Sequence, residues 1–158
     1  MTVYVASDHA GFALKEALLP LLREELGVEV IDCGAHTFEE GDDYPDLIAV
    51  AARAVSEQPE GAQALVLGGS GQGEAIVANR FPHVRAIVFN GQYAPRDGRE
   101  VPHEIETARQ HNDANVLSLG ARFLSEEEAK EAVRFFFTTP FSGDERHVRR
   151  IAKIEQYP

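Results

Sequence analysis

The stretch ALVLGGSGQGEAIVANR, residues 64–80, combines three features that indicate an α/β protein. It opens with a short apolar run, places four glycines within residues 67–73, and continues into a helix that we expect to begin near Gly73. In an open parallel sheet, ligands bind beyond the carboxyl ends of the strands, near the point where the strand order reverses. A helix that begins there directs free backbone N–H groups toward the ligand. The stretch therefore predicts a site for an anion or for a developing oxyanion.

Short apolar runs on both sides of this stretch alternate with segments of helical periodicity. The predicted strands are residues 2–7, 28–34, 64–70, 85–90 and 115–122. Further helices are predicted over residues 12–26, 46–58, 125–137 and about 144–157, with a capping box at Ser125 and Glu128 and a kink at Pro20. Runs that are apolar nearly throughout are typical of parallel strands buried on both faces. The alternation predicts one domain over residues 1–158, a three-layer, Rossmann-like α/β/α sandwich around a five-stranded parallel sheet.

Composition excludes several classes of partner. The 158 residues include 15 Lys and Arg against 26 Asp and Glu, a net charge of −11. An acidic surface repels polyanions, so we expect neither nucleic acid nor a membrane as a partner. The single cysteine, Cys33, excludes an internal disulfide and fits a reducing compartment. No signal sequence and no long apolar span is evident, so a cytoplasmic protein is expected.

Three interpretations of the glycine loop compete. A tight turn without a ligand is common, but it needs fewer glycines. The second interpretation is a nucleotide site, which has two forms. A phosphate-binding P-loop requires Lys and then Ser or Thr after its last glycine, where this chain has Glu74 and Ala75. A dinucleotide site is disfavoured because the next strand ends in Phe89 and Asn90 rather than in an acid. The third interpretation is an oxyanion hole that faces Glu74, with Glu74 as a catalytic base. The alternative role for Glu74 is that of a surface acid favoured at a helix N-terminus.

Other polar residues are predicted near the strand ends. Asp8 and His9 follow the first strand directly, although Asp8 could equally serve as a helix N-cap. Arg122, at the end of the fifth strand, suits a phosphate because its guanidinium is planar and always charged. His111 precedes that strand in a polar, turn-forming setting that is more typical of surface histidines.

Six segments together resemble the type B ribose-5-phosphate isomerases, a family that includes galactose-6-phosphate and allose-6-phosphate isomerases. They are SDHAGFALKEAL, DCGAH, DDYPD, GGSGQGEAIVANR, RQHNDANVLSLGAR and TTPFSGDERHVRRI, in the family's order and over nearly the whole chain. The resemblance implies an aldose–ketose isomerase of the pentose phosphate pathway that needs no cofactor and no metal and works through a cis-enediol. It also implies a homodimer, or a dimer of such dimers, with active sites at the dimer interface.

The resemblance also implies roles for individual residues. Many members carry a catalytic cysteine where this chain has Gly68, whereas a subgroup with the motif GGSGxGE uses its glutamate, so Glu74 is implied as the base and Cys33 is an ordinary buried residue. The implied catalytic residues are Glu74, Ser70, His111 and Asp8. Substrate or phosphate binding is implied for His9, Tyr44, Gly71, Gln72, Gly73, Asn112, Arg122, Arg146 and Arg150. The C-terminal helix would thus contribute to the dimer and to the phosphate site; its alternative is a solvated basic face.

One segment departs from the family pattern. Residues 91–110, GQYAPRDGREVPHEIETARQ, are longer than expected by roughly ten residues, centred on Pro95 to Glu106. The added part could reshape the sugar pocket, extend a helix or form a dimer contact. The substrate could therefore be ribose 5-phosphate, a hexose 6-phosphate such as allose or galactose 6-phosphate, or a tetrose phosphate. A non-catalytic phosphosugar-binding module is the alternative of another class, because a fold alone does not fix a function.

Overall fold

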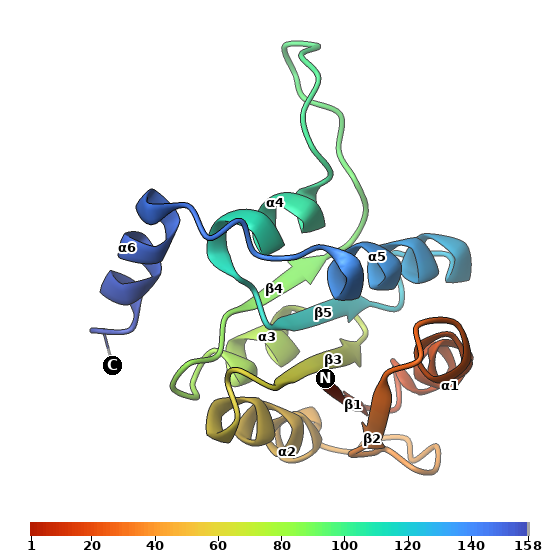
Figure 1. Ribbon diagram of the computed structural model, residues 1–158. Coiled ribbons are helices and arrows are strands. Elements are labelled where there is room, and N and C mark those ends of the chain that lie inside the picture. The colour runs from red at the N-terminus through yellow and green to blue at the C-terminus, as the bar shows by residue number, and fades with distance from the viewer. Residues whose placement is uncertain (158) are drawn as a thin grey trace.

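The computed structural model, which describes residues 1–157, has a five-stranded sheet in which every pairing is parallel (Figure 1). The strands are β1 (Thr2–Ser7), β2 (Glu29–Asp32), β3 (Ala62–Gly68), β4 (Ala86–Phe89) and β5 (Val116–Gly120). Their order across the sheet is β2-β1-β3-β5-β4. The predicted fold class and all five strands are confirmed, with boundaries that shift by a few residues at most.

Residues 1–157 form six α-helices, of which α1 to α5 pack against the sheet. They are α1 (Phe12–Pro20), α2 (Tyr44–Glu57), α3 (Gln72–Ala78), α4 (Glu104–Asn112), α5 (Glu126–Thr138) and α6 (Glu145–Ile154). The disturbance predicted at Pro20 is a π-helical turn, η1 (Leu21–Glu25), in which the N–H of Leu26 donates to the carbonyl of Leu21 at 3.0 Å. The predicted capping box at Ser125 and Glu128 is present.

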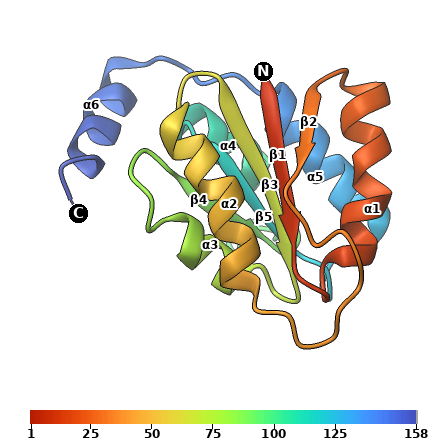
Figure 2. The same ribbon diagram turned by 90° about the horizontal axis from the view of Figure 1, so that it is seen from below.

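The side chains of the central strands alternate between two apolar layers. Leu65 and Leu67 of β3 pack with α1, α4 and α5, whereas Ala64 and Val66 pack with α2 and α3. These two groups of helices cover opposite faces of the sheet (Figure 2). Burial on both faces, which we predicted for all strands, holds for β3 and β5 but is wrong for β2. As an edge strand, β2 leaves Ile31 41% exposed. Cys33, which follows β2, is also only partly buried.

The two edges of the sheet differ in what they carry. At the carboxyl edge, the ends of β1 and β3 lie at the point where strand order reverses, as the ligand-binding rule for such sheets requires. Beyond the amino edge, α6 lies apart from the sheet and contacts α4 (Figure 1). Residues 91–103 project from the body between β4 and α4 (Figure 1). None of the helices within residues 1–157 combines the length and the apolarity needed to cross a membrane.

Candidate active site

The glycine loop between β3 and α3 is fixed from two sides. Gly71 precedes α3 in the left-handed region, with φ of 73°, a conformation that favours glycine. The hydroxyl of Ser118 on β5 donates to the carbonyl of Gly71 at 2.7 Å. The side-chain amide of Asn90, which follows β4, donates to the carbonyl of Ser70 at 3.0 Å. The loop is therefore held in one conformation before any ligand arrives.

Glu74, in the first turn of α3, folds back over the end of β3. Its side chain is only 4% exposed, and its carboxylate occupies the space where a Cβ on residue 68 would stand. Burial raises the pKa of Glu74, and the nearby charge of Asp8 raises it further. Within residues 1–157 no Lys, Arg or His forms an ion pair with this carboxylate. Gly68 and Glu74 thus form a matched pair, in which the absence of one side chain makes room for the other.

A cleft of about 400 Å³ opens beside this carboxylate. Its lining residues are Asp8, His9, Ala10, Tyr44, Gly69, Ser70, Gly73, Glu74, Arg122 and Phe123. The Tyr44 ring lies against Gly73 so closely that a Cβ on residue 73 would stand 2.7 Å from the Cζ atom of Tyr44. The structure brings seven of the predicted site residues together here, and Gly71 and Gln72 continue the same loop.

The Arg122 side chain is held against the glycine loop. Beyond the strand ends, the backbone N–H of Ala121 donates to Gly68 at 2.9 Å and that of Arg122 donates to Gly69 at 3.1 Å. A Cβ on Gly69 would stand 3.1 Å from the guanidinium carbon of Arg122. These bonds extend the register of β3 and β5 and fix a permanent cation in the cleft that contains Glu74.

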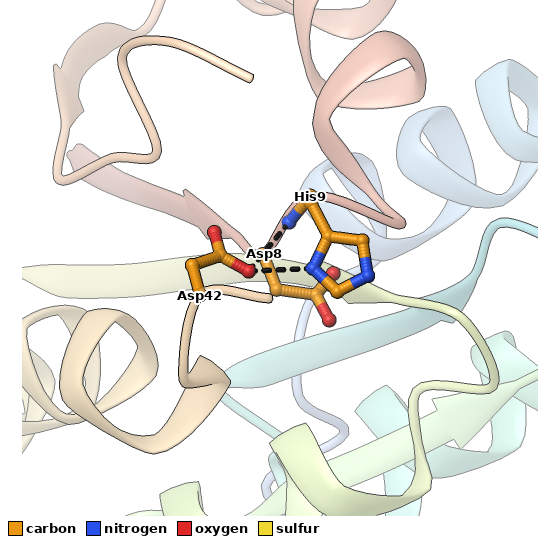
Figure 3. A group of neighbouring side chains, drawn as sticks. All are labelled: Asp8, His9 and Asp42. Atoms are coloured by element: carbon orange, nitrogen blue, oxygen red, sulfur yellow. Dashed lines mark hydrogen bonds and ion pairs between the residues drawn. The ribbon is translucent and has the colours of Figure 1, made fainter. Parts of the chain in front are cut away.

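Asp8, His9 and Asp42 form a compact group at the end of β1 (Figure 3). Asp8 accepts from the N–H of Gly11 at 3.0 Å, which stabilises the turn that leads into α1. His9 Nδ1 lies 2.6 Å from Asp42 Oδ1, and this hydrogen bond raises the pKa of His9. One potential ligand atom from each of the three residues lies within 4.8 Å of the others. We assign the close approach to hydrogen bonding, because His9 Nδ1 is already engaged by Asp42.

The remaining predicted residues do not lie in this cleft. His111 belongs to the last turn of α4, at the amino edge of the sheet, where its ring stacks on His147 of α6 at 4.3 Å. Asn112 follows it, and its carbonyl accepts from Arg85 Nε at 3.0 Å, just before β4. Arg146 and Arg150 are on α6. A single chain therefore divides the predicted site between opposite edges of the sheet (Figure 1).

Sequence analysis missed three residues that shape the cleft: Asp42, Asn90 and Phe123. Asp42 lies within an acidic loop, 33 residues from His9, and no local pattern indicates which of the neighbouring acids turns inward. In the sequence, Asn90 is distinguished only as the residue that ends a strand. Phe123 is 62% exposed, and its position directly after Arg122 was the only signal.

The fold and the cleft define a Rossmann-like α/β protein in which a buried carboxylate, a histidine and an arginine line one cleft at the carboxyl edge of the sheet. Residues 3–154 match the profile of the family described as Ribose/Galactose Isomerase. The chain belongs to this family and is thereby an enzyme of the isomerase class.

Individual relatives match over almost their full length. Ribose-5-phosphate isomerase B of Mycobacterium tuberculosis H37Rv is 40% identical over 159 residues, which cover 99% of this chain and 90% of the relative. A putative sugar phosphate isomerase of Bacillus subtilis is 32% identical over 158 residues, which cover 99% of this chain and 97% of the relative. The crystal structure of Mycoplasma genitalium ribose-5-phosphate isomerase B with bound ribulose 5-phosphate aligns with a TM-score of 0.86 at 32% identity, over 99% of this chain and 95% of that one.

Proposed function

We propose that this protein interconverts ribose 5-phosphate and ribulose 5-phosphate, with Glu74 as the base. The relatives named ribose-5-phosphate isomerase B support the substrate, and one of them has been crystallised with ribulose 5-phosphate. The observation that carries the proposal is the buried Glu74 carboxylate, which lies in the cleft, forms no ion pair within the described part of the chain and fills the space left by Gly68. This arrangement supports membership of the subgroup that uses glutamate in place of cysteine.

The chemistry of Glu74 follows from its environment. In the open-chain aldose, the ionised carboxylate removes the proton from C2 while the C1 carbonyl electrons move to O1, which yields a cis-enediolate. The same group, now a carboxylic acid, returns the proton to C1; the O2 proton is transferred to O1, and the carbonyl forms at C2. Because burial raises its pKa, Glu74 is a stronger base than an exposed glutamate, and a raised pKa is typical of catalytic carboxylates.

The glycine loop would stabilise the charge that develops on the substrate. Backbone N–H groups from Ser70 to Gly73, together with the Ser70 hydroxyl, are proposed to hold the enediolate oxygen. Such a donor is typically worth about 3 to 4 kcal/mol of activation barrier. The fixed positions of the Ser70 and Gly71 carbonyls favour this role, because a preorganised loop needs no rearrangement as charge develops.

The phosphate and ring-opening groups complete the site only if a second copy contributes. We propose a homodimer in which α4 and α6 of one copy close the cleft of the other. His111, with Asp8 nearby, would move a proton from the C1 hydroxyl to the ring oxygen as the bond between C1 and that oxygen breaks. The phosphate would be bound by His9 and Arg122 from one copy and by Arg146 and Arg150 from the other, with Tyr44, Gln72 and Asn112 lining the sugar. Exposed apolar side chains on α6, Val148 and Ile154, support such a contact.

Proton exchange in D₂O tests the activity and the base together. Native protein is expected to convert ribose 5-phosphate to ribulose 5-phosphate with deuterium incorporated at the exchanging carbon, as followed by NMR. Glu74→Gln should lower the rate by about 10²- to 10⁴-fold, the usual contribution of a positioned base. Retained exchange in the variant would eliminate Glu74 as the base.

Complementation tests the two-chain site. Glu74→Gln and His111→Ala are each expected to be nearly inactive, but mixed after unfolding and refolding they should recover roughly a quarter of native activity. Half of the dimers are then mixed, and each mixed dimer contains one intact site of its two. No recovery, with mixed dimers demonstrated by mass spectrometry, would place Glu74 and His111 in the site of one chain.

A hexose 6-phosphate is the second candidate substrate. The family description names galactose as well as ribose, and the projecting residues 91–103 lead directly into α4, which carries His111. The same exchange assay on hexose and tetrose phosphates separates the two candidates. Binding of every phosphosugar without exchange would indicate a non-catalytic binding module instead.

A further inference from the structure

Asp42 approaches His9 from a different part of the chain. It lies in the loop between β2 and α2, and one oxygen, Oδ1, contacts both the backbone N–H of His9 at 3.1 Å and its Nδ1 at 2.6 Å (Figure 3). The Asp42 side chain is only 12% exposed. Its second oxygen, Oδ2, is buried and has no hydrogen-bond partner within residues 1–157. The carboxylate therefore depends on His9 for its contacts.

The charge of Asp42 requires a cation nearby. Removing a carboxylate from water is costly unless a charged partner compensates for the lost solvation. Among the described residues, the one basic side chain within ion-pair distance of Asp42 is His9. The His9 ring supplies such a cation when both of its nitrogens carry a proton. With Nδ1–H donated to Asp42, the Nε2–H on the opposite side of the ring is free for a ligand.

We propose that Asp42 is a positioning residue that keeps His9 as an imidazolium whose Nε2–H binds the substrate phosphate together with Arg122. This inference rests on the proposed function, because it assigns the cleft to a phosphosugar. His9 and Arg122 line the same cleft, so a phosphate between them would meet two cations. A neutral histidine offers a hydrogen bond there, whereas an imidazolium adds charge assistance, which roughly doubles the strength of the bond.

The groups around His9 determine how this binding changes with pH. The hydrogen bond to Asp42 and the charges of Asp8 and Asp42 raise the pKa of His9, whereas burial and Arg122 lower it, and the result is a raised pKa. Glu74 is the remaining ionisable acid of the cleft. A phosphomonoester becomes a dianion above about pH 6. Phosphate binding should therefore be strongest above that pH and should weaken as the pH rises through the pKa of His9.

Asp42→Asn separates a charge effect from a structural one. The amide oxygen can still accept from the N–H of His9, so the loop contact is kept while the charge is lost. We expect the pKa of His9 to fall in this variant, as followed by NMR titration of the imidazole resonances and assigned with a His9→Gln spectrum. Asp43→Asn is the matched control, because it removes the same charge from the adjacent, exposed residue. The pKa of His9 should be unchanged in Asp43→Asn.

Ligand binding and kinetics provide the functional readouts. At about pH 7.5, Asp42→Asn should weaken the binding of inorganic phosphate about tenfold, and it should raise KM for ribose 5-phosphate while kcat is maintained. The pH at which KM begins to rise should move downward. An unchanged His9 pKa with unchanged phosphate affinity would reduce Asp42 to a loop contact and overturn the proposal.

Two further outcomes are decisive. If Asp42→Asn does not fold, titration of native protein decides, because a His9 pKa at or below its ordinary value contradicts the proposal. If native protein isomerises no phosphosugar but the pKa of His9 is raised and falls in Asp42→Asn, the proposed function fails while the Asp42–His9 pairing stands.

Discussion

Lys15 and Glu74 both have ionisable side chains that are buried, but they differ in whether an oppositely charged side chain lies beside them. Lys15 on α1 is fully buried and pairs with Asp32 and with Glu16, each at 2.7 Å. Burial alone would raise the pKa of Asp32, but hydrogen bonds from Lys15 and Gly34 outweigh it and lower that pKa. Among residues 1–157 no cation pairs with Glu74, and its pKa is raised. A buried charge that is paired joins elements of the fold, whereas one left unpaired at a cleft is available for chemistry.

The largest expected effect comes from breaking the paired charge. Lys15→Met should lower the free energy of unfolding by about 3 to 5 kcal/mol, because it leaves the partly buried Asp32 without its cation. Urea denaturation measures this change. Arg134→Met is the control, since it breaks the ion pair between the exposed Arg134 and Glu25 and should cost less than about 1 kcal/mol. Equal losses of unfolding free energy in the two variants would show that the buried Lys15 pair contributes no more to stability than the exposed Arg134 pair.

The next largest effect comes from crowding the unpaired charge. Gly68→Ala places a methyl group in the space of the Glu74 carboxylate, which must then move. A displacement of about 1 Å at a reacting group typically costs about 10²-fold in rate, so kcat for isomerisation should fall by that factor while the protein stays folded. Gly61→Ala is the matched control, because a Cβ there meets open space. A Gly68→Ala enzyme with native kcat would contradict the claim that the missing side chain of Gly68 makes room for the Glu74 carboxylate.

Much of this architecture was accessible from sequence because it follows from local pattern and topology. Apolar runs identified all five strands, and the carboxyl ends of parallel strands share an edge, which was enough to bring Asp8, Glu74 and Arg122 together. The helix α4 was not predicted as a separate element. Its sequence is mostly polar, and its two apolar side chains, Ile105 and Ala108, are buried but are too few to form a continuous apolar stripe.

The contrast between Lys15 and Glu74 was not accessible from sequence. Lys15 occurs in an ordinary amphipathic pattern, and its burial depends on Asp32 arriving from β2, 17 residues away. Asp42 likewise meets His9 through a loop whose path the sequence does not specify. His111 and Arg146 lie at the opposite edge of the sheet from the cleft, and the second copy that we propose to bring them to it is described by no pattern within one chain.

The smallest expected effect is also the sharpest test of the comparison between Lys15 and Glu74, because it measures how the unpaired Glu74 charge changes the free energy of unfolding. The pKa of Glu74 is raised in the folded protein, whereas a glutamate in an unfolded chain has a pKa of about 4.3. Below that pH both states are protonated and ionisation has no effect on stability. As the pH rises, the unfolded chain loses this proton more readily than the folded chain, so native protein loses stability until the pH passes the raised pKa.

Glu74→Gln removes that penalty because glutamine does not ionise. The variant should be more stable than native protein by on the order of 1 kcal/mol at about pH 8, and the gain should shrink toward about pH 5. Urea denaturation at the two pH values measures the difference, with Glu60→Gln, an exposed acid, as the control that should show no such trend. A Glu74→Gln protein that is less stable at both pH values would mean that the carboxylate holds the fold together as the Lys15 pair does. A gain confined to high pH would mean that the fold tolerates this charge at the expense of stability, as expected when a base is kept ready for its substrate.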